Sequence, residues 1–148
     1  MEEISDITLR WFDESALMEK EPRELTKTLL ASLGITSDVA VDVLEVLLKS
    51  SAQDRARRTA EIREEVVKLR KERGVKKERG VTLRNIQVWV KYFKEIKLID
   101  RVGERVHFTG NKKPSQAFRE YTRPIIEESA SFIEKLFEKT EQAYGIQS

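Results

Sequence analysis

The side chains of this sequence that could do chemistry are mainly basic and lie in its centre. Residues 53–113 contain 19 Lys and Arg against 9 Asp and Glu, a net charge of +10. Residues 1–52 carry a net charge of −6 and residues 114–148 a net charge of −2. Lys and Arg bind phosphates and release the counterions condensed on nucleic acids. We therefore expect an anionic partner for the central segment; the competing interpretation is a solvated, highly charged surface.

The residue types that most enzymes use are scarce. The sequence has no Cys and a single His, His107, which excludes disulfides, thiol nucleophiles and Cys/His zinc sites. His107 alternates with Val106 and Phe108, which favours a structural role over a ligand role. Asp and Glu are dispersed among Lys and Arg, so no acid/base pair, nucleophile triad or metal cluster is indicated. We expect neither an enzyme nor a cofactor nor a metal site.

The elements that must position the basic residues follow from apolar spacing and turn residues. Pro22 predicts a helix start and Gly34 a helix end, Thr82 predicts an N-cap, and the turn Gly103-Glu104 predicts a hairpin. The expected helices are 5–19, 22–33, 38–49, 58–71, 82–96 and 124–144, with a polar connection at 50–54, a loop at 72–80 and strands at 99–102 and 105–108. The sequence thus predicts a mainly α fold with a small β-hairpin.

Three helices followed by a hairpin, in the order 38–49, 58–71, 82–96 and 99–108, have the order of a winged helix. Three motifs add to this order: Leu33-Gly34-Ile35-Thr36, Thr59-Ala60-Glu61-Ile62, and the run from Phe93 to Val102, FKEIKLIDRV. Together they resemble archaeal winged helix-turn-helix transcription regulators over roughly residues 33–110, although that family commonly has glycine in place of Lys97. The resemblance implies a winged-helix domain, here 35–113, that binds double-stranded DNA. The apolar spacing outside it predicts a helical extension over 1–34 and a C-terminal dimerisation helix within 114–148.

The expected DNA-binding residues lie on one helix, on the basic loop and along the wing. If Ile86, Val90 and Phe93 are buried, the opposite face of helix 82–96 carries residue types that read bases. The full set is Arg57, Arg58, Lys76, Lys77, Arg79, Thr82, Arg84, Asn85, Gln87, Lys91, Arg101, Arg105, Lys112 and Lys113. The loop 72–80 is longer than the usual turn between such helices, and it is either a second phosphate contact or a solvated insertion.

The last predicted helix carries a heptad pattern of apolar residues. Intervals of 4, 3, 4, 3 and 4 separate Ile126, Ala130, Ile133, Phe137, Thr140 and Tyr144. Such a seam is typical of two helices packed side by side, and it predicts a homodimer whose interface holds Ile126, Ala130, Ile133, Phe137 and Tyr144. The pairing could also bury Trp11 and Phe12. The alternative is a helix that packs back on its own domain or on the amino-terminal helix.

These features favour a dimeric double-stranded DNA-binding protein that regulates transcription. The alternative is a winged-helix module, or accessory subunit, that contacts proteins and not DNA. No apolar run approaches the roughly 20 residues of a membrane span, and the amino terminus is acidic, unlike a secretory signal, so we expect a cytoplasmic protein without membrane contact. No domain for a small-molecule ligand follows the wing. High Lys, Glu and Arg without Cys also suit a thermophile.

Overall fold

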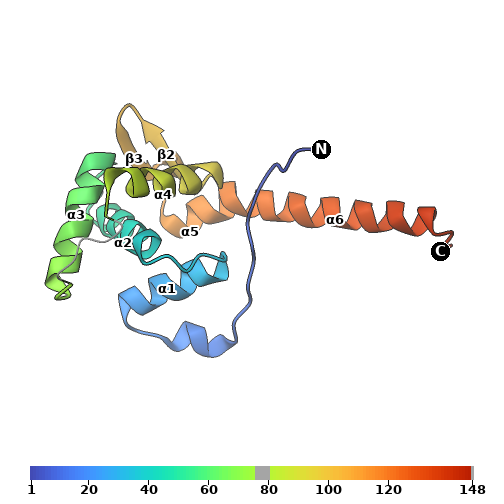
Figure 1. Ribbon diagram of the computed structural model, residues 1–148, viewed down its shortest axis with the longest axis horizontal. Helices are drawn as coiled ribbons and strands as arrows, with labels where there is room; N and C mark the ends of the chain where they lie inside the picture. The colour runs from blue at the N-terminus through green and yellow to red at the C-terminus, as the bar shows by residue number, and fades with distance from the viewer. Residues whose placement is uncertain (76–80, 148) are drawn as a thin grey trace.

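The computed structural model describes residues 1–75 and 81–147 (Figure 1). As expected, the chain is mainly helical and has a small antiparallel sheet, here of three strands. The elements in order are η1 (Glu14–Met18), α1 (Pro22–Ser32), α2 (Asp38–Ala52), β1 (Arg57–Arg58), α3 (Thr59–Glu72), α4 (Leu83–Glu95), β2 (Ile99–Val102), β3 (Arg105–Phe108), η2 (Thr109–Asn111), α5 (Pro114–Ala117), η3 (Phe118–Thr122) and α6 (Arg123–Ala143).

Helices α1 to α4 pack around one apolar core with α2 at its centre. Fully buried side chains of α2 include Val43 and Leu44, and they belong to one cluster with Ile62 of α3 and Phe93 of α4. The predicted helices 22–33, 38–49 and 82–96 are confirmed to within a few residues, because their caps are local. Helix α2 continues through the predicted polar connection to Ala52, and it buries the Ser50 side chain.

The sheet has the strand order β1-β3-β2, and β2 and β3 form the predicted hairpin. Val106 and Phe108 face the core, while His107 is half-buried and its Nδ1–H donates to the Phe108 carbonyl oxygen at 2.7 Å. Strand β1 was not predicted. The sequence analysis placed Arg58 at the start of a helix, whereas Arg57 and Arg58 pair with β3 before the helix begins.

The first 13 residues are an extended arm, so the prediction of a helix over 5–19 is wrong apart from the 3-10 helix η1. The arm is held by other segments of the chain. The Tyr92 hydroxyl donates to the Asp6 carbonyl oxygen at 3.1 Å, and the Arg10 amide donates to the Ser32 carbonyl oxygen at 2.9 Å. These bonds satisfy the backbone without a helix, which overrides the local apolar spacing.

The C-terminal helix begins earlier than predicted. Helix α5 starts at Pro114, passes through the π-helical segment η3 and continues into α6, so the helical stretch starts ten residues before 124. Helix α6 extends away from the body (Figure 1), and none of its residues is buried. In the single chain the amino-terminal segment contacts this helix at Ser129, through the Ser5 hydroxyl at 3.3 Å, while Phe132, Ile133 and Phe137 farther along stay exposed.

A buried ion cluster joins three helices. The Asp42 side chain of α2 is completely buried, and its carboxylate lies 2.7 Å from Arg23 of α1, 2.8 Å from Arg70 of α3 and 3.1 Å from Arg73. Glu45 lies 2.8 Å from Arg23 at the edge of the cluster. These arginines are part of the fold and not of the exposed basic surface.

Candidate nucleic-acid interface

Helix α4 presents one polar face to solvent and one apolar face to the core. Ile86, Val90 and Phe93 are all buried, as predicted from their spacing. Thr82 caps the helix, because its hydroxyl oxygen accepts a hydrogen bond from the Asn85 amide at 3.1 Å. Trp89 is half-buried and packs against the core, with its ring centroid 6.0 Å from that of Tyr92.

The outward face of α4 carries the residues that the sequence analysis singled out. Arg84, Asn85, Gln87 and Lys91 are all exposed. The Lys91 ammonium lies 3.9 Å from the Glu95 carboxylate, and both side chains are more than half exposed. An exposed pair of this kind contributes at most about 1 kcal/mol to stability, so Lys91 can exchange Glu95 for another anion.

A second group of basic side chains, the wing cluster, consists of Arg55, Arg58, Arg101 and Arg105. Two of its members approach Glu61 of α3: Arg55 at 3.7 Å and Arg105 at 3.6 Å. Arg101 lies 3.5 Å from the Thr59 hydroxyl, and Arg58 lies 3.8 Å from Glu104 at the hairpin tip. The cluster therefore gathers around the N-terminal end of α3, where the hairpin meets it.

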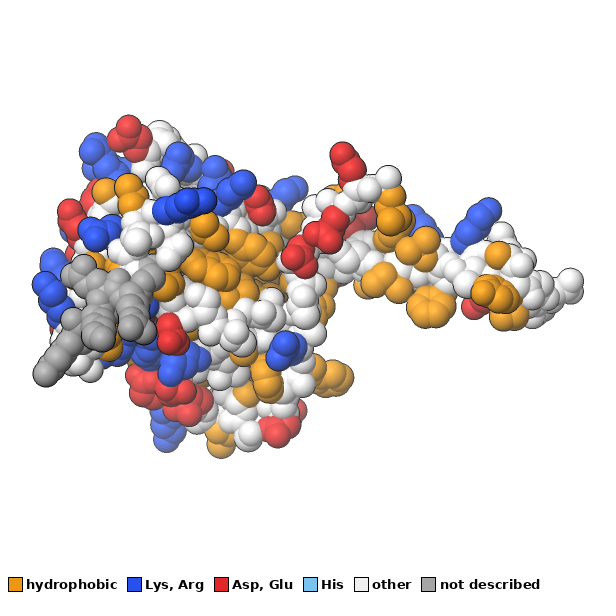
Figure 2. Space-filling view, viewed as in Figure 1, with side chains coloured by type: hydrophobic (Ala, Val, Ile, Leu, Met, Phe, Trp, Pro, Cys, Tyr) orange, Lys and Arg blue, Asp and Glu red, His pale blue; other side chains and the backbone are white. Residues whose placement is uncertain are grey.

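Charge in the wing cluster exceeds what its acidic neighbours neutralise. Three of the four guanidinium groups lie 3.6 to 3.8 Å from two carboxylates, and their side chains, Arg55, Arg58 and Arg105, are about half exposed. Figure 2 shows Lys and Arg side chains along the edge formed by the hairpin and α4. Weak, solvated ion pairs of this kind are readily replaced by phosphates, which bind Arg bidentately.

Lys112 and Lys113 lie beside a different part of the hairpin. With Arg105 and His107 they line a cleft of about 690 Å³ between the end of α2 and the hairpin. Among the described residues that line it, none belongs to α4. Lys112 also forms an ion pair with Glu120 and lies over the Tyr121 ring. Its hydrogen bond to Glu120, together with the charges of Glu120 and Tyr121, raises the pKa of Lys112.

One predicted phosphate contact is a structural residue. Arg57 is buried, with only 8% of its surface exposed, and its guanidinium donates to the Ser50 hydroxyl at 3.1 Å and to the Gln53 amide oxygen at 3.3 Å. Its neighbour Arg58 is exposed, because side chains alternate along a strand. The other expected contacts Lys76, Lys77 and Arg79 lie outside the described residues.

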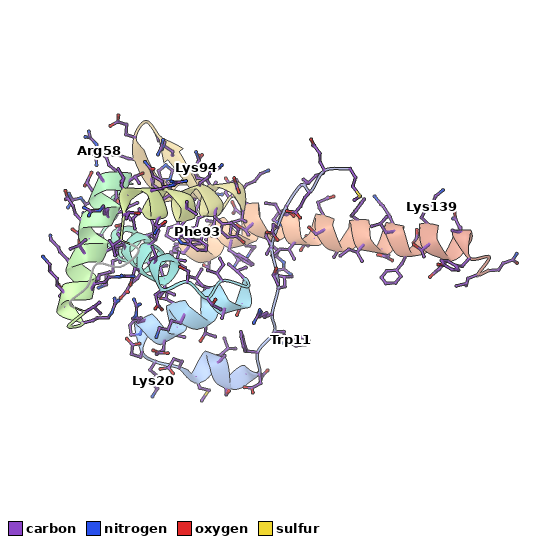
Figure 3. The ribbon with its side chains drawn as sticks, in the orientation of Figure 1. Trp11, Lys20, Arg58, Phe93, Lys94 and Lys139 are labelled. Atoms are coloured by element: carbon purple, nitrogen blue, oxygen red, sulfur yellow. The ribbon has the colours of Figure 1, made fainter. Side chains whose placement is uncertain are left out.

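Three basic residues near the interface were missed by the sequence analysis. Arg55 belongs to the wing cluster, and Lys94 is exposed in the last turn of α4, where Figure 3 shows it beside the hairpin. Arg63 of α3 donates to the Val81 carbonyl oxygen at 3.0 Å and so holds the entry to α4. The helical period could have indicated Lys94, whereas no sequence signal joins Arg63 to Val81.

Comparisons with known proteins add no family. No family model, no curated protein and no solved structure matches this chain. In the described part of the chain, no helix has the length and apolarity needed to cross a membrane. Within residues 1–75 and 81–147, there is also no group of three or more His, Asp or Glu side chains that could hold a metal ion.

Proposed function

We propose that this chain is a winged-helix protein that binds double-stranded DNA as a dimer and regulates transcription. The observation that carries the proposal is α4, whose core face is buried while its outer face offers Arg84, Gln87 and Lys91 beside an arginine-rich hairpin. The order α2, α3, α4 and hairpin supports the winged-helix assignment. The regulatory role rests on the resemblance to winged-helix regulators.

Helix α4 would act as the recognition helix. An α-helix fits the major groove of B-DNA, where Arg pairs bidentately with guanine and Gln with adenine. Arg84 and Gln87 are three positions apart on the exposed face, so both can reach base edges from one helix position. Thr82 and the first backbone N–H groups of α4 would meet a phosphate, because helix N-termini favour anions.

The wing cluster would supply contacts to the phosphate backbone. Its four arginines stand at the junction of hairpin and α3, and contacts of this type position a protein without reading sequence. On binding, DNA phosphates would take the place of Glu61 and Glu104 as partners of these arginines. The counterions condensed on the DNA are then released, so binding should weaken steeply with salt. Lys112 and Lys113 would extend this positive edge along the cleft.

The apolar face of α6 supports the dimer. Its exposed residues include Ile133 and Phe137 of the predicted seam, at 53% and 65% exposure. A two-fold axis through this seam would present two copies of α4 to successive major grooves. We therefore propose a pseudo-palindromic site with half-sites about one helical turn, or a multiple of it, apart.

One observation favours the alternative of a protein-contact module. Val88 is 52% exposed on α4 and Leu83 is 42% exposed at its start, and apolar side chains on an outer helix face suit a protein partner. The thymine methyl group is the only apolar feature of the major-groove edge, so Val88 is compatible with DNA as well. Salt dependence distinguishes the two functions.

The test is DNA selection at near-physiological salt followed by fluorescence anisotropy on the selected site. Arg84→Ala and Gln87→Ala should each lose about 1–3 kcal/mol on that site and little on random DNA. The double variant Arg101→Ala/Arg105→Ala should instead weaken both and reduce the salt slope by about one for each phosphate that is no longer neutralised. Lys20→Ala, just before α1 and away from α4 and the hairpin (Figure 3), is the matched control.

Two results would contradict the proposal. Failure to retain any DNA at low salt would favour the protein-contact module. Equal losses by Arg84→Ala on every DNA sequence would make Arg84 a phosphate contact and exclude α4 from base recognition.

A further inference from the structure

The apolar face of α6 is wider than a two-helix seam needs. Around the helix, apolar residues cover both the predicted seam and its flank, which carries Ile125, Phe132 and Leu136. A two-stranded coiled coil requires apolar residues at two of seven positions, and a wider face is typical of helices with a second neighbour. No residue of α6 is buried in the single chain, and Phe132 and Leu136 of the flank are 60% and 49% exposed, which leaves them free for an additional element.

The N-terminal arm, residues 1–13, is anchored to the rest of the chain through residues 5–10. Ser5 lies 3.3 Å from Ser129 of α6, measured between the two hydroxyl oxygens. Thr8 passes so close to Gly34 that a Cβ on this glycine would lie 2.7 Å from the Thr8 Cβ. Ile7 packs against the core. The hydrogen bonds from Tyr92 and to Ser32 add two further anchors.

The outward side of this anchored arm is apolar. Trp11 is completely exposed and Leu9 is 54% exposed, and in Figure 3 Trp11 points away from the body. A fully exposed Trp on a fixed backbone loses little conformational entropy when a partner covers it, and Trp is the residue most enriched among energetically dominant interface residues.

We propose that Trp11 of each copy packs on the apolar face of α6 of a second copy of this chain. The inference rests on the dimer of the proposed function and adds the arm to its interface. Within one chain the arm bonds α6 at Ser129 and then runs to Ser32 of α1, while the rest of α6 extends away from the body (Figure 1). A two-fold axis pairs each arm with the other copy's helix, so one symmetric association covers both surfaces.

The surface area that a dimer would bury supports a contribution of the arm to the interface. Five of the large side chains exposed on α6 and just beyond it are Phe132 (60%), Ile133 (53%), Leu136 (49%), Phe137 (65%) and Tyr144 (81%). Taking about 150–250 Å² for a whole aromatic side chain and about half of that for an aliphatic one, two copies would bury about 1,000 Å² through them. Stable interfaces bury about 1,200–2,000 Å². Trp11 and Leu9 from both copies bring the total to about 1,500 Å², within that range.

The experiment measures the dimer dissociation constant by sedimentation equilibrium for wild type, Trp11→Ala, Trp11→Phe and Val102→Ala. Val102 is an apolar residue of the hairpin with 64% exposure, and it serves as the matched control. We expect Trp11→Ala to raise the dissociation constant about 30-fold or more for each of the two symmetric contacts, the effect of truncating a dominant interface residue, and so roughly 1,000-fold for the dimer. Trp11→Phe should recover part of the loss and Val102→Ala should have no effect.

Photo-crosslinking identifies the partner surface. A photoreactive phenylalanine at position 11, in a mixture of isotope-labelled and unlabelled protein, should crosslink to residues 130–144 of the other copy. Two results would overturn the arm contact but not the dimer. One is a crosslink within one chain, and the other is a dimer dissociation constant that Trp11→Ala leaves unchanged. A wild-type monomer at micromolar concentration overturns the dimer together with this contact, and DNA binding by the monomer would preserve the remaining proposed function.

Discussion

Replacing Asp42 by Asn should destabilise the fold by about 3–5 kcal/mol, the cost of removing one partner from a buried ion pair. The Asp42 carboxylate is fully buried and lies within 3.1 Å of Arg23, Arg70 and Arg73. Asn has nearly the same shape, so the substitution removes the charge and leaves no cavity. Three guanidinium groups on three sides would then face each other around a neutral amide.

The three arginines contribute unequally to this magnitude. Arg70 is 9% exposed and Arg23 14% exposed, whereas Arg73 is 30% exposed and is screened by water. Burial by itself lowers the pKa of the Arg23 guanidinium, but the hydrogen bond and charge of Asp42, followed by those of Glu45, raise it above its ordinary value. Most of the expected loss therefore comes from Arg23 and Arg70, which have the least water to replace Asp42.

The assay is urea denaturation followed by circular dichroism at one fixed protein concentration, because the stability of a dimer depends on concentration. For a chain of this size, a decrease of about 3–5 kcal/mol in the free energy of unfolding would also lower Tm in thermal unfolding by roughly 6–20 °C. Glu24→Gln is the matched control, since Glu24 pairs with Lys27 at 3.3 Å and both side chains are about half exposed, and it should cost about 1 kcal/mol or less. Equal effects of the two substitutions would refute the reasoning that burial makes Asp42 dominant.

Two further predictions concern single residues of α4 and its end. Lys97 has φ +62° at the position after a helix where glycine is favoured, so Lys97→Gly should stabilise the fold by about 0.5–1 kcal/mol in urea denaturation; destabilisation would contradict this account. Burial, with the charges of Asp6 and Glu95, raises the pKa of Tyr92 above its ordinary value of 10.0. The stability that protonated Tyr92 provides should be complete below pH 10 and lost as pH rises through the raised value. In wild type, ionisation of Tyr92 should therefore accelerate the hydrogen exchange of residues 5–10. In Tyr92→Phe, which has no phenolic hydroxyl, this additional acceleration should be absent.

The sequence alone was sufficient to predict the elements whose ends are set by local residues. Pro22 begins α1, Gly34 ends it with a positive φ of 78°, and Thr82 caps α4. The hairpin also formed at Gly103-Glu104, because a two-residue turn sets the register of its strands. The exposed face of α4 followed from the same reasoning, since burial of Ile86 and Val90 leaves Arg84 and Gln87 outside.

Only the tertiary structure decided which basic residues are available to a partner. Arg57 and Arg58 are neighbours of one type, yet a strand buries the first and exposes the second. The arm shows the same limit, because its apolar spacing predicted a helix while contacts with Gly34 and Tyr92 hold it extended. Asp42 meets Arg70 across 28 residues of sequence. Such pairs depend on the packing of distant helices, and a one-dimensional pattern of charges and apolar residues carries no record of that packing.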